Sequence, residues 1–249
     1  MNKSLLTIFL TFCGCLIIFS CSKTVSTPTP TPTPLTLPAM YNKFNVSLQV
    51  YVEGNFVIIK STGIPDHKSP YFQPTDPRYE SYNGSNPSFM LNPNRILSQS
   101  LTYKIPLTPS ESPTKPATPL GPIGVAINGV PLFNQYAGPG TPLTNEINSF
   151  DQYNGHPQQS GSYHYHVEPK YLTTLKGKDA LLGVLLDGYP IYGPSENGIV
   201  LTSSNLDAYH GHTGATLEFP NGIYHYHTTA DAPYINGSGF FGVPGSVTQ

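Results

Sequence analysis

Two identical Tyr-His-Tyr-His tetrapeptides, at residues 163–166 and 224–227, hold four of the chain's eight histidines. In a β-strand, side chains two positions apart point to the same face and lie about 6.5–7 Å from each other. The two histidines of each tetrapeptide would therefore share one face, with the tyrosines on the other. Two imidazoles at this spacing can converge on one metal ion. The predicted ligands are His164, His166, His225 and His227.

Further ligands are expected upstream, where a Gly-His pair precedes each tetrapeptide. His156 and His212 each follow a glycine, which lets the backbone turn tightly. His210 is a weaker candidate in the second copy. Asp151 and Asp207 recur at the same place before each Gly-His pair. Either carboxylate could bind the metal, or could accept the second N–H of a ligand histidine and fix its tautomer.

Asp66 and His67 form a further, weaker candidate pair after a turn. For His67 alone, a histidine that stabilises the turn is the default interpretation. The tetrapeptides also have a purely structural interpretation, in which the tyrosines pack in the core and the histidines bond to loops. Two copies, each with its own Gly-His pair, favour metal binding over that alternative.

The cysteine content narrows the choice of metal. The three cysteines are Cys13, Cys15 and Cys21, so the body of the chain offers no thiolate. Cysteine-type structural zinc, iron–sulfur clusters and blue copper all require sulfur ligands. Imidazoles with carboxylates suit a transition metal ion, with copper or zinc favoured. The sequence leaves open whether the histidines build two sites or one composite site.

The fold that must position these residues is predicted to be mostly β. A repeat of roughly sixty residues, the size of a supersecondary unit, covers about 124–168 and 183–229. Each copy opens with a hairpin pattern. Asn128-Gly129 predicts a type I′ turn in the first copy, and Asp187-Gly188 takes its place in the second. Pro131 and Pro190 predict that the return strands lie at a sheet edge.

Outside the repeats, the expected elements are few. Alternation from Val46 to Val50, followed by residues 56–59, predicts an N-terminal β-hairpin region. Residues 101–107 predict another strand, and residues 171–182 the one short helix. We therefore expect one compact β domain.

The N-terminus predicts export. Residues 1–20 resemble a lipoprotein signal peptide, with an apolar run that is short for a membrane span. Cys21 is the predicted lipidation site, and residues 21–40 form a Thr/Pro-rich linker before a domain at 41–249. These features predict a lipoprotein of the bacterial cell envelope, attached to a membrane through the lipid on Cys21. The net charge of −2 gives no reason to expect nucleic acid as a partner.

The chain resembles the YHYH-domain family, a group of exported bacterial proteins of uncharacterised function. The resemblance covers about residues 44–242 and supports the histidine site without implying an activity. The motifs that carry it are Gly63-Ile64-Pro65-Asp66-His67, Gly155-His156-Pro157, Gly161-Ser162-Tyr163-His164-Tyr165-His166, Asp187-Gly188-Tyr189-Pro190-Ile191-Tyr192-Gly193, Gly211-His212 and Gly222-Ile223-Tyr224-His225-Tyr226-His227.

Three functions stay open at this point. The first is metal handling by an exported, lipid-anchored protein. The second is a metal-dependent hydrolase or oxidase, in which Tyr165 or Tyr226 would orient the substrate. The third is a non-metal adhesion or glycan-binding module. The general-base candidates for an enzyme are Asp151, Asp187 and Asp207. The contact surface of an adhesion module would include Tyr71, Tyr79 and Tyr82.

Overall fold

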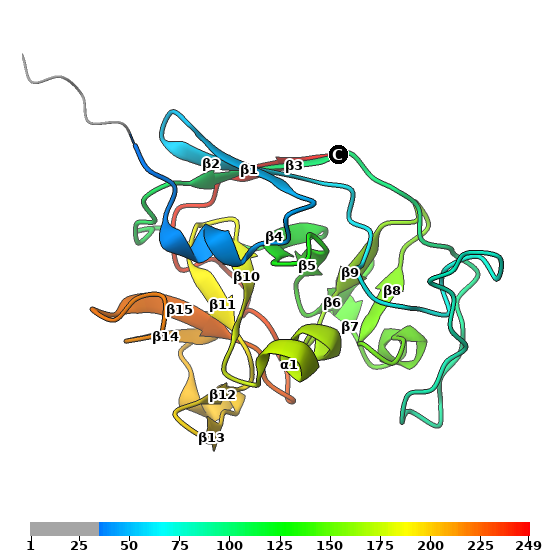
Figure 1. Cartoon of the computed structure of the whole chain (residues 1–249). Coiled ribbons are helices and arrows are strands. Elements are labelled where there is room, and N and C mark those ends of the chain that lie inside the picture. Colours follow the sequence, from blue (N-terminus) through cyan, green and yellow to red (C-terminus); the bar gives the residue numbers. More distant parts are fainter. Residues whose placement is uncertain (1–34) are drawn as a thin grey trace, which may run out of the picture. The chain divides into compact units, whose positions relative to one another are not determined.

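A computed structural model describes residues 35–249, which form one compact unit (Figure 1). The predicted signal peptide, Cys21 and the Thr-Pro tract up to residue 34 lie outside the described residues. The prediction of a mostly β fold is confirmed, since strands outnumber helices and the described part contains one short α-helix. Within residues 35–249, none of the helices has the length and apolar composition that a membrane span needs.

The helices are short. They are the 3₁₀ helices η1 (Ala39–Lys43), η2 (Glu146–Ser149) and η3 (Ser203–Asn205), and the α-helix α1 (Lys170–Lys176). The strands are β1 (Gln49–Glu53), β2 (Phe56–Ser61), β3 (Leu101–Pro106), β4 (Pro122–Ala126), β5 (Pro131–Phe133), β6 (Tyr136–Ala137), β7 (Thr141–Pro142), β8 (Gly155–Pro157), β9 (Tyr163–Tyr165), β10 (Leu181–Leu185), β11 (Pro190–Tyr192), β12 (Ser195–Glu196), β13 (Ile199–Val200), β14 (Gly211–Gly214), β15 (Ile223–His227) and β16 (Ser246–Thr248).

The main sheet has eight strands in the order β14-β15-β11-β10-β4-β5-β9-β8. Its two halves pair in the same way, outward from an antiparallel contact between β4 and β10. In each half an antiparallel hairpin is followed by a parallel pair, β5 with β9 or β11 with β15. The outermost pair is antiparallel again, β8 with β9 or β14 with β15. The two tetrapeptide strands thus lie toward opposite ends of one sheet.

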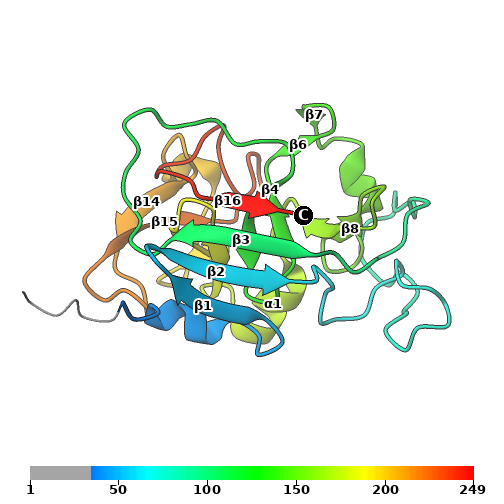
Figure 2. The same ribbon diagram turned by 90° about the horizontal axis from the view of Figure 1, so that it is seen from above.

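A second sheet of four strands, β1-β2-β3-β16, packs over the centre of the main sheet (Figures 1 and 2). Its alternating inward residues, such as Val57, Ile59 and Ile105, are fully buried. They join one hydrophobic core with Val125 and Leu185 of the central strands β4 and β10. The four-stranded sheet therefore covers the middle of the main sheet, and other segments cover its two ends.

The two hairpins of the main sheet form where they are predicted, but their turns differ from the predicted type. Gly129 and Gly188 each have φ +86°, whereas Asn128 and Asp187 do not adopt positive φ. A type I′ turn requires positive φ at both central residues. In each turn the glycine N–H donates to the carbonyl three residues earlier, at 2.8 Å for Gly129 and 3.0 Å for Gly188. The positive φ falls on the residue after the turn, as in a three-residue hairpin loop with a bulge.

The prediction that Pro131 and Pro190 mark a sheet edge is wrong. Both return strands are interior, because β5 lies between β4 and β9, and β11 lies between β10 and β15. Each proline is the first residue of its strand, and the parallel pairing begins one residue later, at Leu132 and Ile191. A first position is the other place in a strand where the missing N–H of proline is tolerated.

Two boundaries also differ from prediction. The first strand begins at Gln49, and Val46 is fully exposed, because Asn45 bonds the N–H of Ser47 through its side chain and that of Leu48 through its carbonyl. This local turn overrides the alternating pattern. The helix predicted for residues 171–182 ends at Lys176, since Gly177 adopts φ +109° and the chain then enters β10.

The close approach of β4 and β10 generates a stability prediction. A Cβ added at Gly183 would lie 2.3 Å from the carbonyl oxygen of Val125 and 2.8 Å from the Cα of Ala126. Gly183→Ala should therefore lower the free energy of unfolding by about 1–3 kcal/mol. Chemical denaturation measures this loss. Gly138→Ala is the matched control, because a Cβ there meets no atom within 4 Å. Equal stability of the two variants would contradict the close approach.

Candidate metal centres

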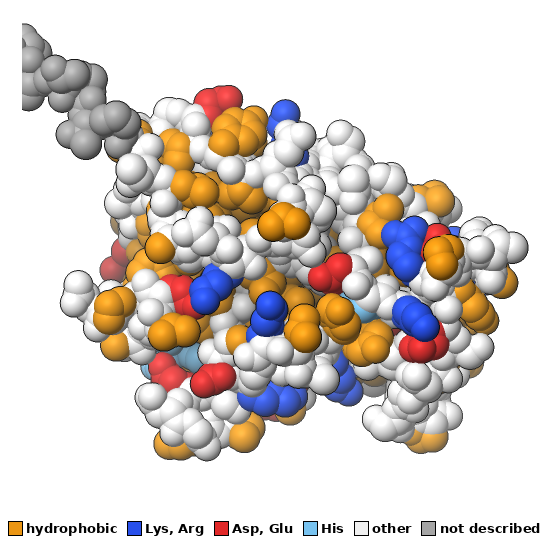
Figure 3. Space-filling model, in the orientation of Figure 1, with side chains coloured by type: hydrophobic (Ala, Val, Ile, Leu, Met, Phe, Trp, Pro, Cys, Tyr) orange, Lys and Arg blue, Asp and Glu red, His pale blue; other side chains and the backbone are white. Residues whose placement is uncertain are grey.

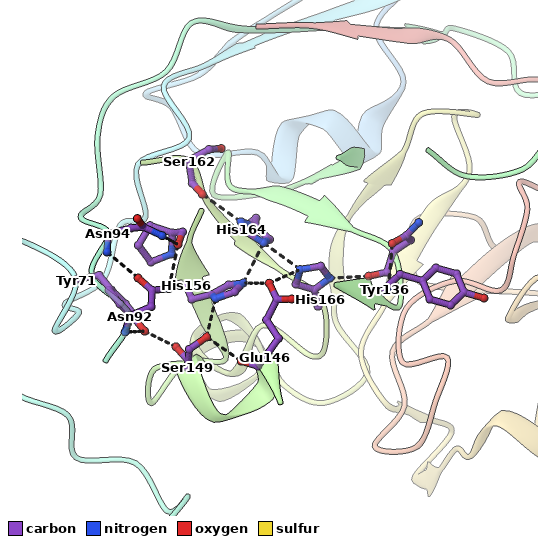
Figure 4. A network of polar contacts seen from close by, with 12 residues as sticks. Tyr71, Asn92, Asn94, Tyr136, Glu146, Ser149, His156, Ser162, His164 and His166 are labelled. Atoms are coloured by element: carbon purple, nitrogen blue, oxygen red, sulfur yellow. Dashed lines mark hydrogen bonds and ion pairs between the residues drawn. The ribbon is translucent and has the colours of Figure 1, made fainter. Parts of the chain in front are cut away.

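The first cluster joins four side chains from three neighbouring elements near one end of the main sheet (Figure 4). The Nε2 atoms of His156 and His164 are 3.1 Å apart, and those of His164 and His166 are 3.0 Å apart. Glu146 Oε1 lies 3.2 Å from His156 Nε2 and 4.0 Å from His166 Nε2. Residue by residue, η2 supplies Glu146, β8 supplies His156, and β9 and the position after it supply His164 and His166.

The second cluster, near the opposite end of the sheet, has the same composition. Strand β15 supplies His225 and His227, β14 supplies His212, and β12 supplies Glu196. The Nε2 atoms of His212 and His227 are 3.2 Å apart. The two oxygens of Glu196 lie 3.4 Å from His212 Nε2 and 3.4 Å from His225 Nε2. In each cluster the four ligand atoms lie within 4.8 Å of one another, so each could hold one metal ion.

The proton positions in the first cluster follow from the partners of the other ring nitrogen. His164 Nδ1 lies 3.1 Å from the carbonyl of Ser162, and His166 Nδ1 lies 2.6 Å from that of Asn134. A carbonyl only accepts, so both Nδ1 atoms carry the proton. In a neutral imidazole the Nε2 atom then holds a lone pair. Two lone pairs therefore face each other at 3.0 Å, an arrangement that a cation between them would stabilise.

Burial keeps these imidazoles neutral. It lowers the pKa of His164 well below its usual range, and the neighbouring His156 and His166 add to the effect when charged. Burial also lowers the pKa of His166 to about 4, although its bond to the carbonyl of Asn134 acts in the opposite direction. The bond from His156 holds the pKa of Glu146 below its ordinary value. Neutral imidazoles and an ionised carboxylate are the forms that bind metal ions.

The second cluster shows the same arrangement. His225 Nδ1 donates to the carbonyl of Ile223 at 3.0 Å, and His227 Nδ1 donates to that of Gly193 at 2.8 Å. Burial lowers the pKa of His225 and brings the pKa of His227 to about 4. The Nε2 atom of His225 is buried and has no hydrogen-bond partner among the described residues. A buried acceptor without a partner is costly unless a ligand satisfies it.

Each cluster opens into a pocket. His164, His166 and Glu146 line one of about 410 Å³, and His225, His227 and Glu196 line one of about 430 Å³. The glutamate side chains are partly exposed, by 27% for Glu146 and 22% for Glu196, whereas the paired tetrapeptide histidines are buried. Each cluster therefore borders a pocket that its glutamate and its tetrapeptide histidines line.

The predicted roles of the aspartates at the histidine clusters are wrong. Asp151 accepts from Tyr163 at 2.8 Å, Asp187 from Tyr226 at 2.6 Å, and Asp207 from Tyr224 at 3.0 Å. They bond to tyrosines, whose side chains leave the strands on the face opposite the histidines. The second N–H groups of the tetrapeptide histidines go to backbone carbonyls instead. Asp151 and Asp207 recur at matching positions, as the sequence indicates, but their partners are the tyrosines.

The weaker candidates lie outside both clusters. His210 has φ +71° in a turn, where its ring bonds Ser203 and Thr229 and donates to the carbonyl of His227. His67 Nε2 bonds the hydroxyl of Tyr165 at 2.9 Å, and Asp66 accepts from Asn128 at 2.9 Å. The bonds of Asp66 and His67 thus link their turn to residues distant in the sequence, and those of His210 fix the turn before β14.

The tyrosines proposed to orient a substrate or to form an adhesion surface are mostly buried or stacked. Tyr165 and Tyr226 are fully buried, so neither is available to orient a substrate. Tyr71 is fully buried too, and its hydroxyl donates to the carbonyl of Ser149 at 2.5 Å. Tyr82 stacks on Phe89 with ring centroids 3.7 Å apart. A contact surface that includes Tyr71 is excluded by this burial.

Glu146 and Glu196 have no feature in the sequence that marks them as ligands. When the two halves are aligned on Asp151 and Asp207, the residue of the second half that matches Glu146 is Thr202. When the halves are aligned on the hairpin glycines Gly129 and Gly188, the residue of the first half that matches Glu196 is Ala137. The two halves thus take their carboxylate from different elements, η2 and β12. A search for residues shared by both copies could not find either one.

The chain belongs to the YHYH protein family, whose model matches residues 102–198 and 195–238. The matched residues include both tetrapeptides, both Gly-His pairs and both glutamates of the clusters. The description of the family names its motif and no reaction. Comparison with curated proteins finds no match, and neither does comparison with solved structures.

The buried histidines generate a pH prediction for the metal-free protein. In the unfolded chain His166 and His227 titrate near 6.5, but in the folded state their pKa values are about 4. The unfolded state therefore binds more protons between these values, and stability is lost as the pH falls from about 6.5 to about 4. Each histidine contributes up to about 1.4 kcal/mol per pH unit in this window.

Denaturant titrations at several pH values measure this slope. His166→Gln with His227→Gln should flatten it, and adding His210→Gln should flatten it further, because burial lowers the pKa of His210 as well. Burial raises the pKa of Asp187 to about 6, so its protonation adds stability as the pH falls below that value. The slope of the variant is therefore compared with that of the unsubstituted chain. An unchanged slope in the double variant would show that these two imidazoles do not set it.

Proposed function

We propose that the protein binds two transition metal ions, one at each cluster of three histidines and one glutamate, and acts in metal handling. The observation that carries this proposal is the convergence of Nε2 atoms, at 3.0 Å in the first cluster, where both atoms hold lone pairs, and at 3.2 Å in the second. Neighbouring lone pairs repel one another unless a cation or a proton lies between them. The low pKa values disfavour the proton.

The carboxylates support the same proposal. Each cluster has one glutamate oxygen within about 3.5 Å of an imidazole nitrogen, supplied from a different element in each half. A set of three nitrogens and one oxygen matches the preferences of zinc and copper. In direct competition copper should bind more tightly than zinc, following the general order of divalent metal affinities.

Elemental analysis of the full chain, purified without a histidine-containing tag and loaded with Zn²⁺, tests the proposal. Two ions per chain are expected. His164→Ala and His225→Ala should each leave one ion, and the double variant should leave none, because each substitution removes one of four ligand atoms that lie within 4.8 Å of one another. His210→Ala is the matched control and should keep both ions. Two ions in the double variant would overturn the assignment.

A metal-dependent hydrolase or oxidase is a second candidate, and the pockets beside the clusters favour it. An ion held by these side chains would face a space of about 410 or 430 Å³. In catalytic zinc sites three protein ligands leave a position for water or substrate. Asp151, Asp187 and Asp207 are bonded to tyrosines, so a base would have to come from the clusters or pockets. Turnover by the loaded chain that disappears in His225→Ala would favour this candidate over metal handling alone.

We also propose that the protein is a lipoprotein of the bacterial cell envelope, bound to a membrane through lipid on Cys21. The support is the pattern of residues 1–21, in which an apolar run ends in a small residue and a cysteine. Cys21→Ser should move the protein from the membrane fraction of expressing cells to the aqueous fraction. Immunoblots of the two fractions measure the shift, and a variant that stays with the membrane would contradict lipid attachment at this residue.

A further inference from the structure

The two clusters differ in how the histidine outside the tetrapeptide is held. In the first, the side chain of His156 is 4% exposed, and its Nδ1 bonds the hydroxyl of Ser149 at 2.8 Å. In the second, the side chain of His212 is 31% exposed. No hydrogen bond to its Nδ1 comes from the described part of the chain. The ring of His156 is therefore fixed, whereas the ring of His212 borders solvent.

The elements that carry the two glutamates also differ in how firmly the rest of the fold holds them. Helix η2, which carries Glu146, also contains Ser149, whose carbonyl accepts from Tyr71. A backbone bond of 2.8 Å from Met90 to Asn148 ties the same helix to the loop before β3. Glu196 lies on the short hairpin of β12 and β13, whose residues Ile199 and Val200 are 64% and 69% exposed. A backbone bond of 3.0 Å from Ser195 to Lys178 holds the start of this hairpin, but its far strand faces solvent, whereas η2 is tied by two bonds to other segments.

Aromatic side chains shield only the first cluster closely. Phe133 stacks on His164 with ring centroids 4.0 Å apart, and Phe150 lies 4.8 Å from the ring of His156. In the second cluster the nearest such ring is Tyr192, whose centroid is 5.3 Å from that of His225. Figure 3 shows histidine surface next to acidic side chains in the region of β12 and β14, so this end of the sheet presents imidazole to solvent.

We propose that the two centres have different tasks. The first, at Glu146, His156, His164 and His166, retains its ion, and the second, at Glu196, His212, His225 and His227, exchanges its ion and accepts external ligands. The inference rests on the proposed function, because it assumes that both clusters bind metal. Loss of one outer hydrogen-bond partner of a ligand typically lowers metal affinity 10–100-fold. The second centre should therefore release its ion at least about tenfold faster.

A chelator experiment on the full chain tests the inference. The chain is loaded with two Co²⁺ ions and mixed with excess EDTA while the visible absorption is followed. Two phases of equal amplitude are expected, with rates at least about tenfold apart. His225→Ala, which keeps the first centre, should show only the slow phase, and His164→Ala only the fast one. Free imidazole should shift the spectrum of the His164→Ala form and leave that of the His225→Ala form unchanged.

Ser149 tests whether the hydrogen bond to His156 Nδ1 causes the slow release of the ion from the first centre. Ser149→Ala removes the partner of His156 Nδ1, so it should accelerate the slow phase without losing the ion. Ser203→Ala is the matched control, because Ser203 lies on helix η3 and bonds His210, which is outside both clusters. Acceleration by both substitutions would show a general loosening of the fold and overturn the role of Ser149.

The outcomes separate this inference from the proposed function. Two bound ions that leave in one phase would overturn the inference and keep the proposed function. A fast phase in His225→Ala and a slow one in His164→Ala would show that the first centre exchanges its ion faster. That result would also overturn the inference. A chain that binds no Co²⁺ and no Zn²⁺ would overturn both. The measurement on the unsubstituted chain decides between one phase and two even if a variant fails to fold.

Discussion

Buried hydrogen bonds between carboxylates and tyrosines fix the strands on which both clusters depend. Asp151 binds Ser69 and Tyr163 within 2.8 Å, and Asp187 binds Tyr226 and the N–H of Gly242 within 2.9 Å. Because a strand alternates its faces, a tyrosine held on one side places the next histidine on the other. The network of aspartates and tyrosines thus sets the positions of the imidazoles without touching them. Charged or polar groups this deeply buried are tolerated because each has its partner.

The arrangement of the sheet explains why one short sequence motif makes two similar sites. Each tetrapeptide strand runs parallel to the return strand of its own hairpin and antiparallel to the strand of its Gly-His pair. The central contact between β4 and β10 joins the two halves. The Gly-His strand brings a third imidazole beside the pair of histidines from the tetrapeptide. The carboxylate comes from outside this shared framework, which is why its source differs between the halves.

Local patterns were sufficient to predict the histidine faces, the hairpins and the β class, because each depends on residues close in the chain. They failed where a contact between distant segments decides the outcome. Pro131 and Pro190 look like edge residues until the parallel neighbours β9 and β15 are known. Asp151 looks like a metal ligand or a partner of a ligand histidine until strand pairing places Tyr163 beside it. Glu146 and Glu196 have no local pattern at all, since only the tertiary fold brings them to the imidazoles.

The position of the clusters in the sheet has a consequence for its two outermost strands. Strands β8 and β14 are the two outermost strands of the main sheet, and each carries one imidazole of a cluster. Unpaired strand edges tend to fray and to template pairing with other chains, which leads to aggregation. An ion bound by His156 with His164, or by His212 with His225, would cross-link the border strand to its inner neighbour. The effect would matter most at β14, since the side chains of Asn92 and Asn94 already cover the carbonyl of Pro157 in β8. Resistance to aggregation would then depend on occupancy of the second cluster.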